Sequence, residues 1–315
     1  MRPMQLKNLL LTTDFSDLAR TAYGAAAALA KRYEARLHLV HAEQPLPAIY
    51  GVPFEKLRPE FLKDLQQEAS HPALKGLEVE SHLLYDAAPF EKILDLCREA
   101  AMDLIVMATH GRSSLGHLFL GSYTERVVRL ATVPVLTCRK KEGLEPSSFP
   151  RSVLVPFDFS DNARAVFPTA NFLGKHQGVE FTFLKVFPAL DEFFYHRYPT
   201  QKLVEEWREL TKRETVLAAE EFSKLREKEL PALRATFESR DGDPNKEIIK
   251  RAEELQSDLI LMATHGWTGV KRFFLGSVAE KIVRTAPCSV WTVRPEEAST
   301  AADSGSAQHA SMGSA

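Results

Sequence analysis

Two long segments of this chain occur twice in the same order, and this repetition constrains the fold more than any other feature. The segment LLLTTDFSDLAR at 9–20 is matched by VLVPFDFSDNAR at 153–164. Further along, DLIVMATHGRSSLGHLFLGSYTERVVRLATVPVLTCR at 103–139 is matched by DLILMATHGWTGVKRFFLGSVAEKIVRTAPCSVWTVR at 258–294. Matches of this length in a fixed order indicate a duplicated domain. The chain, with 315 residues, is also long enough for two domains of about 150 residues each.

The repeat predicts where the domains begin and end. We place a first domain at 1–140, a linker at 141–150, a second domain at 151–295 and a disordered tail at 296–315, because the linker and the tail are polar segments with little to bury. The offset between the copies is 144 residues from Asp14 to Asp158 and 155 residues from Gly111 to Gly266. The second copy therefore carries about eleven extra residues after its second strand.

Each copy alternates short apolar runs with longer helical patterns. In the first copy the expected strands are 6–12, 35–41, 79–84, 103–109 and 133–139, and the expected helices lie near 16–33, 55–70, 89–100 and 122–131. The continuous runs LIVM and LILM are typical of strands covered on both faces, which predicts a parallel sheet with right-handed crossovers. Ser16 and Ser160 are expected to cap helices, and Pro89 and Pro244 to stand in first helical turns.

Two repeated features follow strands one and four, the strand ends at which open parallel sheets bind ligands. Asp14 and Asp158 come directly after strand one, where a carboxylate can accept hydrogen bonds from a ligand amine or ribose, or can support the turn into the helix. After strand four, ATHG leads through nine residues to a Gly-Ser pair. Glycines and a hydroxyl at a helix start predict a phosphate cradle, although glycine is also ordinary turn punctuation.

These motifs together resemble the universal stress protein family. The residues that carry the resemblance are the TDFS or FDFS start, the DLIVMATHG block, the LGSxxE helix and the final VPVL strand. The resemblance extends over nearly all of residues 4–295, once for each copy. The resemblance implies an α/β fold of two tandem Rossmann-like (adenine nucleotide alpha hydrolase-like) domains, each a five-stranded parallel sheet in the order 3-2-1-4-5 flanked by helices. It also implies that the last strands of the two copies pair, which makes the chain a pseudo-dimer, and a homodimer of two chains is a further expectation.

The ATP-binding branch of that family has G-x-x-G, nine residues and then G-[ST], and Ala108 and Ala263 replace the leading glycine here. The departure favours a nucleotide-free interaction scaffold, whereas the intact Gly-Ser pairs favour binding. The second copy also has Gly242 where the first has alanine, so we expect its site to be the better kept. The site residues implied by the resemblance are Thr13, Asp14, Ala42, Met107, Ala108, His110, Gly111, Gly121 and Ser122 in the first copy and Asp158, Val186, Met262, Ala263, His265, Gly266, Gly276 and Ser277 in the second.

The predicted ligand is ATP, with Mg²⁺ carried by its phosphates, or AMP or another adenine nucleotide. The predicted role is a stress-response and signalling module that acts on an unidentified signalling protein. Neither copy has a P-loop, and no repeated acid or base accompanies His110 or His265, so we expect no enzyme, with a slow ATPase as the alternative. His38 and His41 lie three residues apart on a strand and face opposite sides, so we expect no metal ligand set of the protein's own.

Composition limits the partners and the location. The formal net charge of -2 gives no field that would attract nucleic acid or an anionic membrane. We find no signal peptide pattern and no apolar stretch long enough for a membrane span, and the three cysteines are widely spaced in apolar contexts. These features predict a cytoplasmic protein with reduced thiols.

Overall fold

A computed structural model describes residues 4–45, 53–109, 122–139, 149–188, 201–265 and 275–295. The first domain contains β1 (Asn8–Thr12), α1 (Asp17–Arg20), α2 (Tyr23–Tyr33), β2 (Arg36–Glu43), α3 (Phe54–Ala69), η2 (Pro72–Leu74), β3 (Val79–Tyr85), α4 (Pro89–Glu99), β4 (Leu104–Ala108), α5 (Ser122–Leu130) and β5 (Val135–Cys138). The second contains β6 (Ser152–Pro156), η4 (Ala163–Val166), α6 (Phe167–Gly174), β7 (Glu180–Phe187), α8 (Gln201–Glu229), β8 (Arg234–Asp241), α9 (Pro244–Glu254), β9 (Leu259–Ala263), α10 (Ser277–Thr285) and β10 (Ser289–Val293).

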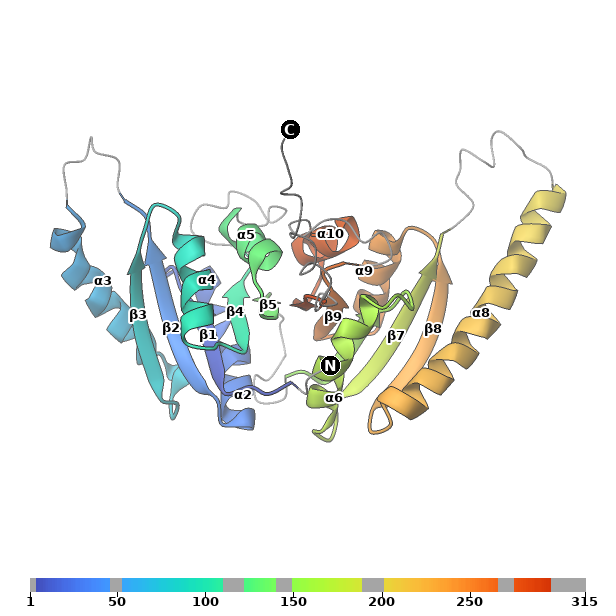
Figure 1. Cartoon of the computed structure of the whole chain (residues 1–315), viewed down its shortest axis with the longest axis horizontal. Helices are drawn as coiled ribbons and strands as arrows, with labels where there is room; N and C mark the ends of the chain where they lie inside the picture. The colour runs from blue at the N-terminus through green and yellow to red at the C-terminus, as the bar shows by residue number, and fades with distance from the viewer. Residues whose placement is uncertain are drawn as a thin grey trace, which may run out of the picture.

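The strands form one ten-stranded sheet in the order β3-β2-β1-β4-β5-β10-β9-β6-β7-β8. Within each half the strands are parallel and follow the predicted order 3-2-1-4-5, so the predicted fold class is confirmed. The halves meet through β5 and β10, which pair antiparallel as the family resemblance implied. The two domains thus stand side by side as a pseudo-dimer with the helices α5 and α10 near the middle (Figure 1).

Helices cover both faces of this sheet, because successive strand residues alternate between two apolar cores. In β1, Leu9 and Leu11 face one core and Leu10 faces the other. The first core packs under helices such as α2, α3, α6 and α8, and the second under α4, α5, α9 and α10. Both cores contain residues of both domains, so the duplicated halves share one continuous interior.

The junction of the halves repeats the same contacts on each side. The Thr137 hydroxyl donates to the Val290 carbonyl at 3.1 Å, and the Thr292 hydroxyl donates to the Val135 carbonyl at 3.1 Å. Beyond the strands, Arg139 donates to the carbonyl of Arg284 at the end of α10. Arg294 does the same for the end of α5, at the carbonyls of Arg129 and Ala131, so each domain satisfies the last carbonyls of the other domain's helix.

The helix signals are largely confirmed. The Ser16 hydroxyl caps α1 by accepting from the Ala19 amide at 3.1 Å, while Pro89 begins α4 and Pro244 begins α9. The Ser160 hydroxyl accepts from the Ala163 amide at 3.1 Å, but the N-cap of η4 is Asn162, so Ser160 supports the turn before η4 instead of occupying the cap position. The single helix expected near 16–33 is instead two helices, since the chain turns between α1 and α2. The predicted tail and, apart from Phe149 and Pro150, the predicted linker lie outside the described residues.

The extra residues of the second copy lie between its second and third strands. The offset is still 144 residues between the starts of β2 and β7, at Arg36 and Glu180, and is 155 residues between the starts of β3 and β8, at Val79 and Arg234. This connection carries α8 with 29 residues where the first domain has α3 with 16. Along the outer flank of the second domain, α8 therefore extends well beyond its counterpart (Figure 1).

Two further features bear on the sequence analysis. Cys97, Cys138 and Cys288 are buried and form no disulfide, and burial raises the pKa of Cys97 and of Cys138 to about 12, which keeps these thiols protonated. Within the described part of the chain, we find no helix with the length and apolar content that a membrane crossing requires.

Candidate functional site

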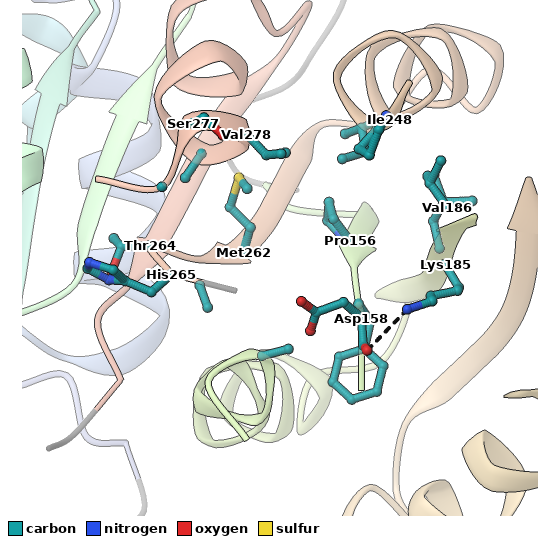
Figure 2. A pocket seen from close by; sticks show the side chains of 17 residues that line it. Pro156, Asp158, Lys185, Val186, Ile248, Met262, Thr264, His265, Ser277 and Val278 are labelled. Atoms are coloured by element: carbon teal, nitrogen blue, oxygen red, sulfur yellow. Dashed lines mark hydrogen bonds between the residues drawn. The ribbon is translucent and has the colours of Figure 1, made fainter. Parts of the chain in front are cut away.

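The carboxyl ends of β6, β7 and β9 and the start of α10 enclose a cavity of about 280 Å³ in the second domain (Figure 2). Seven residues predicted from the sequence line this cavity: Asp158, Val186, Met262, Ala263, His265, Gly276 and Ser277. The eighth, Gly266, lies outside the described residues. In the sheet, β6 lies between β7 and β9, so the chain order of the strands reverses beside β6. The cavity lies at the carboxyl ends of these strands, which is where ligands bind in open parallel sheets.

Asp158 stands in a tight turn that follows β6. Its Oδ1 accepts hydrogen bonds from the Ser160 amide at 3.0 Å and the Ser160 hydroxyl at 2.6 Å. Phe159 between them has φ of 66°, a left-handed conformation that costs a phenylalanine strain energy and that clusters at functional sites. The Asp158 side chain therefore supports the turn into the next helix, one of the two roles expected from the sequence. These bonds also hold its carboxylate at the wall of the cavity.

A lysine that the sequence analysis missed lies beside this turn. Lys185 of β7 lines the cavity, and its Nζ donates to the Asp158 carbonyl at 3.2 Å (Figure 2). Its ammonium also stands 6.0 Å from the ring centroid of Phe159 and 5.6 Å from that of Phe187. The available signal was its position near the carboxyl end of β7, since ligand sites of open parallel sheets lie at that end of the strands.

The start of α10 forms the opposite side of the cavity. The Gly276 amide donates to the Thr264 carbonyl at 2.9 Å, and a Cβ at Gly276 would stand 3.0 Å from that carbonyl oxygen. Glycine is thus required here by the close approach of β9. Ser277 is the first residue of α10 and is exposed, and the helix start contributes partial positive charge. Nearby, the Thr264 hydroxyl and His265 Nδ1 lie 3.0 Å apart.

The rest of the lining is mainly apolar. Val186, Ile248, Met262 and Val278 contribute side chains from β7, α9, β9 and α10 (Figure 2). An apolar wall with a few polar groups from separate strand ends is typical of a small-molecule site. The cavity volume of about 280 Å³ is just below the range of about 300–1,000 Å³ that such sites span.

The first domain repeats the turn of the second. The Asp14 Oδ1 accepts from the Ser16 amide at 3.1 Å and from its hydroxyl at 2.5 Å, and Phe15 has φ of 66°. Ala42 lies in β2, and Met107 and Ala108 end β4, both buried. Ser122 begins α5, while His110, Gly111 and Gly121 lie outside the described residues, so the structure does not show how these positions stand to Asp14.

Beneath the Asp14 turn, a buried polar network occupies the first domain. The Thr13 hydroxyl accepts from the Phe15 amide at 3.1 Å and from the Tyr23 hydroxyl at 2.9 Å. The Tyr23 hydroxyl lies 2.8 Å from Glu68 Oε2, and Glu68 also accepts from Arg20. Burial raises the pKa of Glu68, but hydrogen bonds from Arg20 and Tyr23 outweigh it and lower the pKa below its ordinary value. The Thr13 side chain, predicted as a ligand contact, is thus engaged within the protein.

Comparison with known proteins places the fold in a family. A model of the Universal stress protein family matches residues 5–139 and again residues 150–294. A universal stress protein of Thermus aquaticus is 41% identical over 135 residues, which make up 42% of this chain and 98% of that protein. One from Methanocaldococcus jannaschii is 32% identical over 142 residues, 42% of this chain and 82% of that protein.

A solved structure also matches the whole tandem arrangement. The crystal structure of a universal stress protein from Archaeoglobus fulgidus covers 93% of this chain and 98% of its own, with a TM-score of 0.64 and 21% sequence identity. At that identity the likeness concerns the fold. Because the family model matches both halves of the chain, this protein belongs to the universal stress protein family as a member with two tandem domains.

Proposed function

We propose that this chain binds an adenine nucleotide, ATP foremost, in the cavity of the second domain, and that it acts in the cytoplasm as a stress-response binding module rather than as an enzyme. The observation that supports this best is that seven residues predicted from separate parts of the second copy line one cavity. A common wall for seven such positions is what a shared ligand requires.

The lining offers a suitable partner for each part of a nucleotide. Val186, Ile248 and Met262 would hold a purine ring, and the Asp158 carboxylate would accept from its exocyclic amine or from the ribose. The amide groups at the start of α10 and the Ser277 hydroxyl would bind the phosphates, together with any Mg²⁺ that the phosphates carry. When bound, the nucleotide would supply the signal that alters contacts with a signalling protein, and the chain itself would supply recognition.

A nucleotide-free scaffold is the second candidate, and one observation favours it. The close Thr264 carbonyl already accounts for Gly276, and Ala263 replaces the leading glycine of the family pattern. Under this alternative the cavity wall positions α10 and holds no ligand. Substituting Gly276 cannot separate the two candidates, because any side chain there would press on the backbone of Thr264 whether or not a nucleotide binds.

A cavity-filling substitution separates them. We expect isothermal titration of the nucleotide-free chain with Mg–ATP to show saturable binding, and Val186→Phe to weaken the second-domain site by about tenfold or more, equal to about 1.4 kcal/mol. Ala42→Phe changes the matching position of the first domain and reports whether that copy also binds. Leu217→Ser on the exposed side of α8 is the control that should bind as the parent does. Binding that Val186→Phe leaves intact would place the nucleotide outside this cavity.

The same samples test the expectation about catalysis. We expect the bound ATP to remain unhydrolysed over many hours of incubation with Mg²⁺, which chromatography of the released nucleotide measures. ADP that accumulates in the parent protein, and not in Val186→Phe, would instead establish the slow ATPase.

A further inference from the structure

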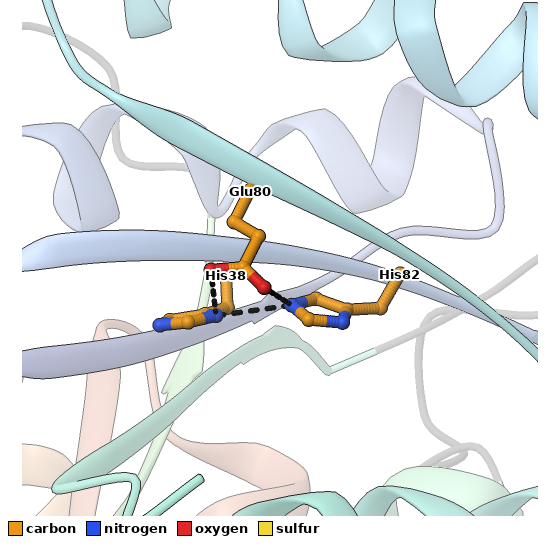
Figure 3. Close-up of side chains that lie close together, drawn as sticks. All are labelled: His38, Glu80 and His82. Carbon is orange, nitrogen blue, oxygen red and sulfur yellow. Dashed lines mark hydrogen bonds and ion pairs between the residues drawn. The ribbon is translucent and has the colours of Figure 1, made fainter.

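Two histidines and a glutamate meet on neighbouring strands of the first domain, far along the sheet from the junction of the two halves. His38 lies on β2, and Glu80 and His82 lie on β3. His38 and Glu80 are direct partners in the parallel register, and His82 is two residues beyond Glu80. All three side chains therefore project from the same face of the sheet and point toward one another (Figure 3).

The candidate ligand atoms of the three side chains lie close together. His38 Nδ1 lies 3.0 Å from His82 Nε2 and 3.6 Å from Glu80 Oε2, and His82 Nε2 lies 3.5 Å from Glu80 Oε1. Around tetrahedral zinc, bonds of about 2.0–2.2 Å place neighbouring nitrogen and oxygen ligands about 3.3 Å apart. With one ligand atom taken from each residue, the three atoms lie within 4.8 Å of one another, close enough for one ion to draw them together.

The chemistry of the three groups also suits a metal. Two imidazoles with one carboxylate make up a ligand set that binds zinc and leaves a fourth position open for water. The His38 side chain is 6% exposed, so its ring is held in place at the buried side of the cluster. Among the described residues, the buried Nε2 of His38 has no hydrogen-bond partner, so the rest of the protein makes no use of this ring beyond the cluster.

Access to the cluster is open from one side. The Glu80 side chain is 51% exposed and that of His82 is 19% exposed. They lie on β3, the outermost strand of the sheet, and the half-exposed Glu80 connects the cluster to solvent. A buried nitrogen at the base and a half-exposed carboxylate at the mouth give the site both a floor and an entry path.

We propose that His38, Glu80 and His82 bind one divalent transition metal ion, Zn²⁺ foremost, with water at the open position. This site is separate from the strand ends at which the nucleotide is proposed to bind, and it does not depend on that proposal.

The second domain provides an internal comparison. In the matching register, Leu10 pairs with His38 and Leu154 pairs with Thr182, so Thr182 and its partner Thr236 occupy the places of His38 and Glu80. Glu238 stands where His82 does and forms an ion pair with Arg251 at 2.5 Å. Threonine hydroxyls are not zinc ligands in such sites, so the proposal predicts one ion per chain and places it in the first domain.

The experiment uses the untagged full-length chain, freed of metal and nucleotide, and titrates it with Zn²⁺ in a buffer that does not chelate. We expect saturation at one Zn²⁺ per chain, and Glu80→Gln and His82→Gln should each weaken binding by about tenfold or more. Zn²⁺ should also raise the melting temperature of the parent and not that of the double variant H38Q/H82Q. His176→Gln, which removes a histidine of the second domain, should bind Zn²⁺ as the parent does.

Two results would overturn the proposal. One is a parent protein that shows no saturable binding of Zn²⁺. The other is binding that Glu80→Gln and H38Q/H82Q leave unchanged, which would place the ion elsewhere and leave the two histidines as a hydrogen-bonded pair that shares a proton. Because Glu80 is half-exposed, its variant keeps the fold, and circular dichroism checks this for all variants.

Discussion

The two domains form the same Asp-Phe-Ser turn, but the residues packed beneath it differ. In the first domain, Thr13 and Tyr23 belong to a buried hydrogen-bond network that ends at Glu68. In the second domain, Phe157 and Phe167 occupy the positions of Thr13 and Tyr23, with ring centroids 5.4 Å apart. The turn geometry is nevertheless the same, with φ of 66° at its central phenylalanine in both copies.

The difference teaches that the turn is set by its own local bonds and not by the chemistry beneath it. The network of the first domain ties α1, α2 and α3 to β1 through directional bonds. The second domain joins the same layers by apolar packing instead. Phe222 of α8 packs on Phe183 and Phe237, with ring centroids 4.8 and 5.2 Å away. Substitutions in the hydrogen-bond network and in the aromatic cluster should therefore change the stability of the protein by different amounts.

The largest difference is expected at the ion pairs below the turns. Glu68→Ala leaves Arg20 and the Tyr23 hydroxyl without their acceptor, and breaking such a buried pair costs about 3–5 kcal/mol. Since the Arg20 side chain is 33% exposed, we expect the lower end of that range. The free energy of unfolding in urea measures it.

The control is the ion pair formed by Arg164, the residue of the second domain that corresponds to Arg20. Arg164 and Glu229 lie 3.7 Å apart and are both partly exposed, so Glu229→Ala should cost less than about 1 kcal/mol. Equal losses at Glu68 and Glu229 would show that the buried network is no more important than a surface pair.

The next prediction removes one hydroxyl from the hydrogen-bond network of the first domain and adds one to the aromatic cluster of the second. Tyr23→Phe removes the hydroxyl that hydrogen-bonds with both Thr13 and Glu68 and should cost about 1–3 kcal/mol. Phe167→Tyr adds a hydroxyl to a residue that is 2% exposed within the aromatic cluster, and we expect a similar loss from burial of a polar group. If thermal melting shows Phe167→Tyr to be as stable as the parent, the aromatic cluster is less tightly closed than the structure indicates.

A smaller effect is expected where β3 and β8 lead into the next helix. Asp243 caps α9, with its Oδ1 accepting from the Asn245 amide at 2.7 Å, whereas Ala88 occupies the N-cap position of α4 and provides no side-chain cap. Asp243→Ala should destabilise the protein by about 0.5–2 kcal/mol, and Ala88→Asp should stabilise it by a comparable amount. Chemical denaturation of both variants tests whether one domain can be improved by copying the other.

The smallest effect is a pH dependence of the first domain's network. The pKa of Glu68 in the folded chain lies below its ordinary value of 4.5, so its carboxylate contributes stability that is complete above that pH and is lost as the pH falls through the lowered pKa. The difference in unfolding free energy between the parent and Glu68→Gln should be constant near neutral pH and shrink in acid below pH 4.5. A difference that grows in acid would contradict this assignment.

The fold could be predicted largely from the sequence because its signals are local or repeated. Apolar runs gave the strands, and Ser16 and Pro89 marked helix starts, while the strand order and the β5–β10 pairing came from the family resemblance. The break between α1 and α2 was missed, since no proline or glycine stands at Thr21 or Ala22.

The side-chain clusters were harder to predict, because they join residues that only the folded register brings together. The pair Arg20 and Glu68 is separated by 48 residues, and His38 and His82 by 44. Reading along β2 correctly puts His38 and His41 on opposite faces, but it cannot show that Glu80 and His82 of β3 stand beside His38. In the second domain, Asp158, Gly276 and Ser277 could be predicted because they follow strands one and four, whereas Val186 and Met262 came from the family resemblance.

The central claim is that the second-domain cavity holds an adenine nucleotide, and counting the nucleotide that purifies with the chain tests it most directly. The protein would be purified without added nucleotide and denatured, and the released adenine nucleotides quantified by ion-exchange chromatography and mass spectrometry for the parent and for Val186→Phe. We predict one ATP per chain if only the second domain binds, or two if both do, and one equivalent fewer in Val186→Phe. No released nucleotide together with no binding of Mg–ATP at millimolar concentration, or the same amount from both proteins, would contradict the claim.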